Sequence, residues 1–197
     1  LFRSRARRAQ RARTCGVGHR VATLLPCDEP THTDGVQNAS SRRGLVSAVT
    51  FEFKTKPFEH QRKAFEERRE RTGDFFLFEQ GTGKTKLALD IAASLFCEGK
   101  IDAVLVLAPN GVSLNWITDE IPVHLSDPVA KVTRTHCWFS SKASTKKHQD
   151  AAQALIGHRG LSFLAMSYDG FTSKRGKEFA KKFLTSRKVF YVLDEST

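Results

Sequence analysis

Residues 46–197 are predicted to form an α/β domain, in which a mostly parallel sheet carries helices on both faces. Three observations lead to this prediction. Short, largely apolar runs such as 102–107 and 189–193 are typical of strands buried on both sides. Stretches with helical spacing of apolar residues separate these runs. A Gly-rich turn at 81–83 stands between a predicted strand and a predicted helix.

The elements follow one another through short connections. Phe alternating with charged residues predicts a half-exposed strand at 51–53, and Pro57 is placed to begin a helix over 58–71. Gly99 is placed to end a helix over 84–97. The other helices repeat apolar residues every three or four positions, and the other strands are apolar runs bounded by polar residues. These strands are predicted at 75–78, 102–107, 130–139, 161–166 and 189–193, and these helices at 112–121, 146–156 and 174–186.

The first fifty residues have a different composition. They hold nine Arg, no Lys and three acidic residues, a net of +6 within a total of +11, and only one of the 15 Phe. Such a segment buries too little apolar surface to offset its ordering entropy, so 1–45 is predicted to be a disordered basic segment. Three functional alternatives are a transit peptide, a nucleic-acid-binding arm and a zinc site. The zinc ligands would be Cys15, His19, Cys27 and His32.

Composition also excludes several classes of protein. No apolar stretch approaches the ~20 residues that a transmembrane helix requires, so no membrane partner is expected. Four Cys in 197 residues do not make a disulfide scaffold, and no secretory leader is recognisable. We expect an intracellular location, which would be cytoplasmic in a bacterium or phage.

The motif Gly81-Thr82-Gly83-Lys84-Thr85 predicts a phosphate-binding loop. The two glycines allow successive backbone N–H groups to point at phosphate oxygens, and the N-terminus of the following helix adds partial positive charge. Lys84 can reach the β- and γ-phosphates of a nucleotide, and the Thr85 hydroxyl can hold Mg²⁺.

A second half of this site is predicted at the end of the last apolar strand, where Asp194 and Glu195 follow 189–193. Ligands of parallel sheets bind at the carboxyl ends of the strands. Asp194 is expected to hold Mg²⁺, and Glu195 to act as general base or to orient water. Lys84, Asp194 and Glu195 are therefore the candidate catalytic residues.

Together the two motifs resemble the first motor lobe of superfamily-two helicases, most closely the Swi/Snf-type DNA translocases, including those of phages and bacteria. The resemblance covers about 50–197 and implies a RecA-like P-loop NTPase lobe. Pro57-Phe58-Glu59-His60-Gln61 is similar to the family motif that precedes the loop. It implies that Gln61 reads the adenine edge and that Phe58 packs near the base. A buried Gln61 with protein partners is the alternative.

Further motifs lie on the nucleic-acid side of that family. Leu107-Ala108-Pro109-Asn110 and Met166-Ser167-Tyr168-Asp169 resemble segments that face DNA, which implies contacts by Pro109, Asn110, Ser167 and Tyr168. Trp116 and Glu120 continue the first of these motifs, although Trp116 is expected to serve packing more than DNA contact. Asp194-Glu195-Ser196 resembles the acidic motif, with Thr197 where a His is usual. The general loop pattern would also place Gly at the position of Phe78.

The resemblance implies an ATP-dependent DNA helicase or translocase, which uses ATP and Mg²⁺ and favours duplex DNA over RNA. The second motor lobe of the family is missing, so the chain is expected to be an incomplete piece that hydrolyses ATP barely by itself. One alternative is an RNA helicase or the motor of a restriction enzyme. Another is a non-catalytic, basic nucleic-acid-binding fragment, in which the Arg-rich arm binds.

Overall fold

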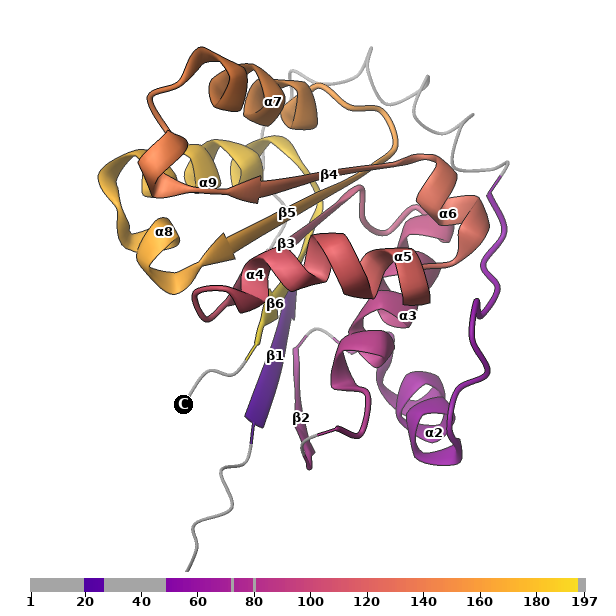
Figure 1. The fold of residues 1–197 in the computed structure, drawn as a ribbon. Helices are drawn as coiled ribbons and strands as arrows, with labels where there is room; N and C mark the ends of the chain where they lie inside the picture. Colours follow the sequence, from indigo (N-terminus) through magenta and orange to yellow (C-terminus); the bar gives the residue numbers. More distant parts are fainter. Residues whose placement is uncertain (1–19, 27–48, 72, 80, 195–197) are drawn as a thin grey trace, which may run out of the picture.

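The computed structural model describes residues 20–26, 49–71, 73–79 and 81–194 (Figure 1). It is an α/β structure with strand order β2-β1-β6-β3-β5-β4. Strands β6, β3, β5 and β4 are all parallel, which confirms the predicted α/β class and the mostly parallel sheet. The strands are β1 (Arg20–Pro26), β2 (Asp74–Phe78), β3 (Ala103–Ala108), β4 (Thr133–Trp138), β5 (Leu161–Ser167) and β6 (Val189–Leu193).

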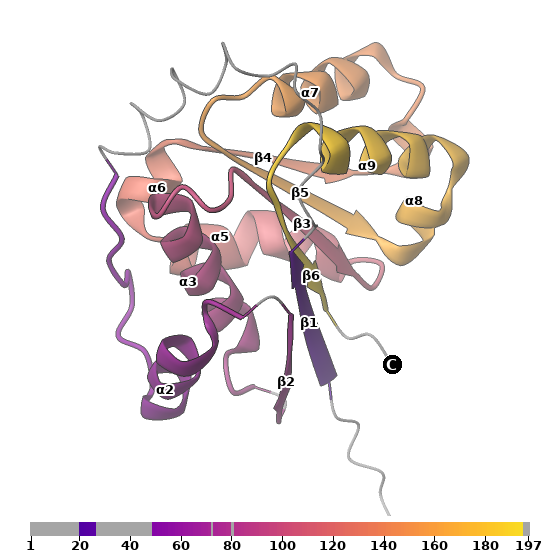
Figure 2. The ribbon, with the colours of Figure 1, turned by 180° about the vertical axis from the view of Figure 1, so that it is seen from behind.

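Helices lie on both faces of this sheet, as Figures 1 and 2 show from opposite sides. The helical elements are α2 (Glu59–Arg68), α3 (Lys84–Cys97), α4 (Val112–Asn115), the π turn η1 (Trp116–Glu120), α5 (Ile121–His124), α6 (Asp127–Lys131), the 3₁₀ turn η2 (Ser140–Lys142), α7 (Lys146–Ile156), α8 (Tyr168–Thr172) and α9 (Lys174–Ser186).

Strand β3 shows why the sheet needs two covering layers. All six of its residues are buried, and successive side chains point to opposite faces. Val104 and Val106 join the apolar cluster that holds Phe96 of α3. Leu105 joins the cluster that holds Phe183 of α9. The apolar runs in the sequence are continuous because both faces of these strands are dry.

Four elements have the predicted bounds: α3, α7, α9 and β6. In α3, every residue from Lys86 to Phe96 is buried, so the helix runs through the interior and places its N-terminus at the edge of the sheet. The helix is ended by Gly99, which has a φ angle of +69° and so adopts the left-handed conformation that commonly ends helices.

The prediction of a strand at 51–53 is wrong. This segment is extended but lies outside the sheet. The rings of Phe51 and Phe53 pack against Phe65 of α2, with centroids 5.4 and 5.1 Å away. The alternation of Phe with charged residues therefore reflects one face lying on a helix, which has the same two-residue period as a strand.

The other predicted elements differ from the structure by one to three residues at their ends, and the helix predicted at 58–71 ends at Arg68. The strand predicted at 130–139 begins at Thr133, because the residues before it form α6 with Pro128 in its first turn. The helix predicted at 112–121 continues to His124 and contains the π turn η1. Helix α8 was not predicted, since five residues are too few to show a periodicity.

Residues Arg20–Pro26 form β1, although the whole of 1–45 is predicted to lack ordered structure. The strand pairs antiparallel with both β2 and β6. Val, Thr and Leu in this stretch favour strands, and the pairing satisfies backbone groups on both sides. The rest of 1–45, including the four candidate zinc ligands, lies outside the described residues.

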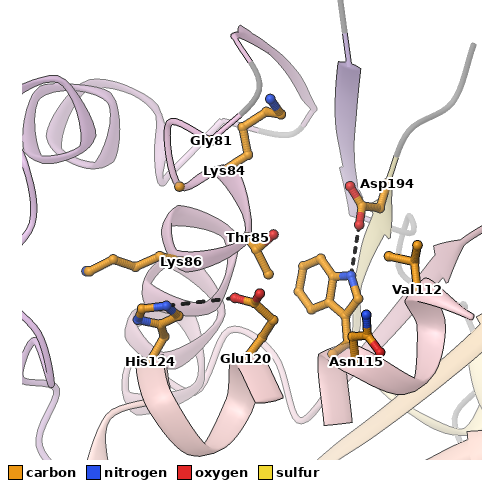
Figure 3. A pocket seen from close by; sticks show the side chains of 11 residues that line it. Gly81, Lys84, Thr85, Lys86, Val112, Asn115, Glu120, His124 and Asp194 are labelled. Atoms are coloured by element: carbon orange, nitrogen blue, oxygen red, sulfur yellow. Dashed lines mark hydrogen bonds and ion pairs between the residues drawn. The ribbon is translucent and has the colours of Figure 1, made fainter. Parts of the chain in front are cut away.

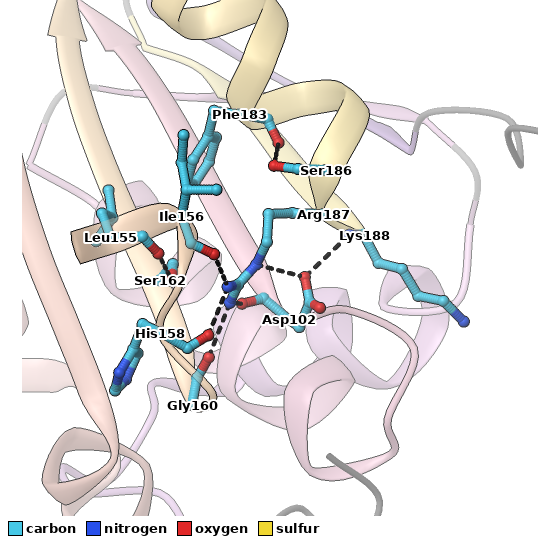
Figure 4. Close-up of polar contacts among 10 residues, drawn as sticks. All are labelled: Asp102, Leu155, Ile156, His158, Gly160, Ser162, Phe183, Ser186, Arg187 and Lys188. Carbon is cyan, nitrogen blue, oxygen red and sulfur yellow. Dashed lines mark hydrogen bonds and ion pairs between the residues drawn. The ribbon is translucent and has the colours of Figure 1, made fainter. Parts of the chain in front are cut away.

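At the amino ends of the strands, a single buried side chain ties several segments together (Figure 4). Arg187 stands just before β6, and its side chain is 1% exposed. Its guanidinium donates to the carboxylate and the backbone carbonyl of Asp102, just before β3. It also donates to the backbone carbonyls of Ile156, His158 and Gly160. The polar groups at the amino ends of these strands therefore stabilise the fold. A ligand site is to be looked for at the carboxyl ends.

No helix in the described part of the chain has the length and apolar character to cross a bilayer.

Candidate functional site

A pocket of about 440 Å³ opens at the carboxyl ends of the strands (Figure 3). Gly81 and Gly83 of the loop and Lys84 and Thr85 of the first turn of α3 line one side. Asp194, which directly follows β6, lines the other. The structure therefore brings together residues that are 110 positions apart in the chain and were predicted to share a site.

Two glycines of the loop have a left-handed backbone conformation. Gly81 and Gly83 have φ angles of +80° and +77°, which residues with a Cβ rarely adopt. Gly83 is the N-cap of α3 and has no side chain to cap it. The first-turn amides of a helix have no intrahelical acceptor and carry partial positive charge. An anionic oxygen in the pocket would supply the missing acceptors.

The ammonium of Lys84 is held at the start of the same loop. Its Nζ donates to the backbone carbonyls of Phe78 and Glu79, at 2.8 and 2.9 Å. Both acceptors are neutral oxygens at the end of β2. A phosphate oxygen would replace these neutral acceptors with a charged one, so that both partners of the hydrogen bond would be ionised. Lys84 is therefore placed to serve a phosphate at the rim of the pocket.

Asp194 is held by contacts from three elements. Its backbone N–H donates to the carbonyl of Leu107 at the end of β3, over 2.8 Å. Its backbone carbonyl accepts from the Tyr168 hydroxyl, at 2.7 Å. Its carboxylate accepts from the indole N–H of Trp116, at 2.9 Å. Glu195, the neighbouring candidate, lies outside the described residues.

The contact between Trp116 and Asp194 is the part of the site that the sequence did not reveal. Trp116 is 2% exposed, as expected for packing, but its N–H also reaches the predicted Mg²⁺ ligand. A buried indole usually finds an acceptor for its N–H, so a Trp that is expected to be buried predicts such a partner. The sequence alone does not say which acceptor, because the pair is separated by 78 residues.

Gln61 contacts the loop and does not line the pocket. It is 2% exposed, and its Oε1 accepts from the backbone N–H of Phe58. Its Nε2 donates to the carbonyl of Thr82 at 2.9 Å. Both ends of the amide therefore have protein partners, as the alternative of a satisfied buried residue requires. Adenine recognition by Gln61 stays a prediction.

Phe58 lies outside the pocket lining but close to the loop. Its side chain is 67% exposed and stacks on the ring of His60, with centroids 5.8 Å apart. His60 in turn lies 3.1 Å from the carbonyl of Thr82. An exposed aromatic ring next to the loop fits the predicted position beside a base.

The four residues predicted to face nucleic acid gather at the same edge of the sheet. Strands β3 and β5 are parallel neighbours with Ala108 opposite Ser167. Pro109 and Asn110 therefore follow β3 beside the place where Ser167 ends β5. The side-chain amide of Asn110 donates to the carboxylate of Asp169 at 2.5 Å, which links the two strand ends.

The side chains of Ser167 and Tyr168 have partners within the chain. The Ser167 hydroxyl accepts from the backbone N–H of Gly170 and caps α8. The Tyr168 hydroxyl donates to the backbone of Asp194, and burial near that carboxylate raises the pKa of the phenol. The Tyr168 hydroxyl therefore helps to fix the backbone of Asp194. Nucleic-acid contact by Ser167 and Tyr168 stays a prediction.

A second carboxylate, Glu120, lines the pocket from the π turn. Burial, Asp119 and Asp194 together raise its pKa. The His124 ring lies 3.8 Å from Glu120, and burial lowers the pKa of that imidazole. Negative charge from Glu120 and Asp194 on one side and the basic loop on the other suits a metal ion bound to an anion.

The site residues are chemically suited to Mg²⁺ and a nucleotide. Mg²⁺ prefers oxygen ligands and is usually held by one or two protein groups together with substrate phosphates. The Thr85 hydroxyl and the Asp194 carboxylate border the same pocket as the loop and can act in this way. No protein-family model and no curated protein that was compared with the chain matches it. The interpretation of the pocket therefore depends on these residues and their geometry.

Proposed function

We propose that residues 46–197 form the ATP-binding lobe of a helicase-type, DNA-dependent ATPase with a RecA-like P-loop fold. The observation that carries this proposal is the shared pocket of Lys84, Thr85 and Asp194. The loop and the acidic residue stand at the carboxyl ends of parallel strands, where nucleotides bind in such sheets.

Each residue has a defined task in this proposal. The backbone N–H groups of the loop and Lys84 bind the phosphates, while Thr85 and Asp194 hold Mg²⁺. The bound Mg²⁺–ATP supplies the phosphoanhydride that water cleaves. Glu195 orients that water or accepts its proton. The pocket walls around Trp116 limit access of bulk solvent to Asp194, which is 9% exposed.

DNA is the proposed partner because the segments that resemble DNA-facing motifs adjoin the pocket. Pro109 and Asn110 extend from the end of β3, the strand whose Leu107 carbonyl binds the Asp194 N–H. A nucleic acid that contacts this edge would act on a strand end one hydrogen bond from the proposed Mg²⁺ ligand. The net charge of +11 also favours a polyanion.

Lys84→Ala tests the nucleotide site. The wild-type chain should bind Mg²⁺–ATP in a calorimetric titration, and the variant should bind at least about tenfold more weakly, because charge-assisted bonds contribute about 1.5–3 kcal/mol. Lys177→Ala is the matched control, since Lys177 is exposed on α9 and is not among the residues that line the pocket. Equal affinity of Lys84→Ala and wild type would refute the proposed site.

DNA dependence is tested by linkage. If duplex DNA and Mg²⁺–ATP bind to coupled sites, saturating DNA should raise the affinity for Mg²⁺–ATP severalfold, and duplex RNA should do so less. An equal or larger effect of RNA would favour the RNA helicase alternative.

A truncation separates the motor lobe from a basic binding arm. Only residues 1–19 should be removed, because Arg20–Pro26 pair with two strands of the sheet. This deletion takes away six of the nine Arg in the first fifty residues. A motor lobe should retain DNA binding and its linkage to ATP. Complete loss of DNA binding would favour the non-catalytic alternative.

A further inference from the structure

A side chain from a distant part of the chain contacts the carboxylate of Asp194. The Trp116 indole N–H donates to Asp194 Oδ2 over 2.9 Å, in a buried position. Figure 3 draws this bond as the dashed line that ends at Asp194. The contacts from Leu107 and Tyr168 reach only the backbone of Asp194. They place the residue, but the rotation of its side chain depends on contacts such as the one with Trp116.

A π turn carries Trp116 to this place. Within η1, the backbone N–H of Ile121 bonds to the carbonyl of Trp116, five residues earlier. Pro122 follows at once, and it has no N–H and crowds the carbonyl of the residue four positions before it. The helix widens where it meets this proline, and such turns often occur at functional sites. The same turn also brings Glu120 to the pocket.

Packing alone does not require an indole at this position. The Trp116 ring lies 6.1 Å from the ring of Phe163, at an interplanar angle of 30°. A phenyl ring could make that contact but has no N–H. Trp138 offers a comparison, because it is also buried but its N–H has no hydrogen-bond partner among the described residues. In this fold a buried indole N–H therefore does not always have a partner, and the one at Trp116 is directed at a carboxylate.

We propose that Trp116 is a positioning residue that holds the Asp194 carboxylate in the orientation needed for Mg²⁺. This inference rests on the proposed function, because it assigns Asp194 to the metal. A hydrogen bond to a metal-binding carboxylate fixes its rotation and tunes its charge, and removal of such a partner typically weakens metal binding about 10- to 100-fold. The effect should appear in Mg²⁺-dependent binding and not in the binding of metal-free nucleotide.

Trp116→Phe and the matched Trp138→Phe test this inference. ATP affinity is measured by calorimetry for both variants and wild type, once with Mg²⁺ and once with EDTA. Trp116→Phe should weaken Mg²⁺–ATP binding about tenfold or more and leave metal-free binding unchanged. Trp138→Phe should change neither. Circular dichroism and thermal unfolding show whether each variant is folded.

A double-mutant cycle with Asp194→Asn tests whether Trp116→Phe lowers Mg²⁺–ATP affinity through the Asp194 carboxylate. If Trp116 acts through the Asp194 carboxylate, Trp116→Phe should have little further effect on Mg²⁺–ATP binding in the Asp194→Asn background. Additive losses would overturn the inference. Unchanged Mg²⁺–ATP affinity in Trp116→Phe, or an equal loss with and without Mg²⁺, would also overturn it.

Fluorescence provides a readout that does not depend on affinity. The chain has two Trp, so Trp116 is the only indole in Trp138→Phe. Its emission should change when Mg²⁺–ATP binds and change less with ATP in EDTA. If the emission stays constant while calorimetry shows Mg²⁺–ATP binding, the proposed coupling of Trp116 to a metal-binding Asp194 is contradicted.

The two proposals fail in different ways. If wild type does not bind Mg²⁺–ATP, or if Lys84→Ala binds it equally well, the proposed function is wrong and this inference falls with it. If wild type binds, Lys84→Ala does not, and Trp116→Phe binds like wild type, only the role of Trp116 is wrong.

Discussion

Among single residues, Gly83 carries two constraints at once. Its φ of +77° is a left-handed conformation, and a Cβ at this position would overlap the side-chain amide nitrogen of Gln61. That nitrogen donates a hydrogen bond to the Thr82 carbonyl, which would be lost if the side chain moved away. Gly81 shares the positive φ, +80°, but has open space around it. A comparison of Gly81 with Gly83 therefore separates the energetic cost of backbone strain from that of steric overlap.

Gly83→Ala should therefore destabilise the chain more than Gly81→Ala. Left-handed strain costs roughly 1–2 kcal/mol in either variant. Displacement of Gln61 should add about 1 kcal/mol for the hydrogen bond that is broken. The free energy of unfolding from urea denaturation measures both. In a Gln61→Ala background the difference between the two alanine variants should disappear, and a persistent difference would rule out Gln61 as its cause.

Among the elements, the ends of the strands have separate tasks. The carboxyl ends present the loop, Asp194 and the turn after β3. The amino ends of β3 and β6 are joined through Arg187 and Asp102 (Figure 4). The polar groups at the amino ends therefore stabilise the fold, whereas those at the carboxyl ends line the pocket.

Arg187→Met tests the structural edge. The substitution keeps much of the apolar stem but leaves the Asp102 carboxylate and several backbone carbonyls with fewer donors. Removing one partner of a buried ion pair costs about 3–5 kcal/mol, which urea denaturation should show as a lower free energy of unfolding. Arg175→Met, at an exposed position of α9, is the control and should stay within about 0.5 kcal/mol of wild type. A loss below about 1 kcal/mol for Arg187→Met would argue against its role.

In the whole molecule, stability should depend on pH through a pair of rings between β4 and α7. The rings of His136 and His148 lie 4.6 Å apart, and the Nε2 atoms of both are buried without a hydrogen-bond partner in the described part of the chain. Burial, and then the charge of His148, lower the pKa of His136 to about 4. Burial, and then Lys142, lower the pKa of His148. Both imidazoles are therefore held neutral in the folded state.

The unfolded chain binds a proton at His136 near its ordinary pKa of 6.5, whereas the folded chain does so only near 4. Between these values the unfolded state holds more protons, so the free energy of unfolding should fall as the pH is lowered. His136→Phe should flatten this dependence, because a phenyl ring cannot take up a proton. Thermal unfolding at several pH values between 8 and 4 measures the effect. Equal slopes for the variant and wild type would contradict it.

Local pattern was enough to predict much of this protein. The bounds of α3, α7, α9 and β6 agree because each has a clear periodicity or an unbroken apolar run. Lys84, Thr85 and Asp194 could be predicted to share a site because glycine spacing and an acidic strand end are local features. Where two structures share one period, as at Phe51 and Phe53, local pattern predicted the wrong element.

Tertiary structure alone established the relations between distant residues. The bond from Trp116 to Asp194, the place of Arg20–Pro26 between two strands and the contacts of Arg187 join segments far apart in the chain. A buried donor must find an acceptor, but the sequence does not state which one, since that depends on how the helices pack on the sheet. Residue types therefore revealed the chemistry available to the pocket, and packing set which groups meet there.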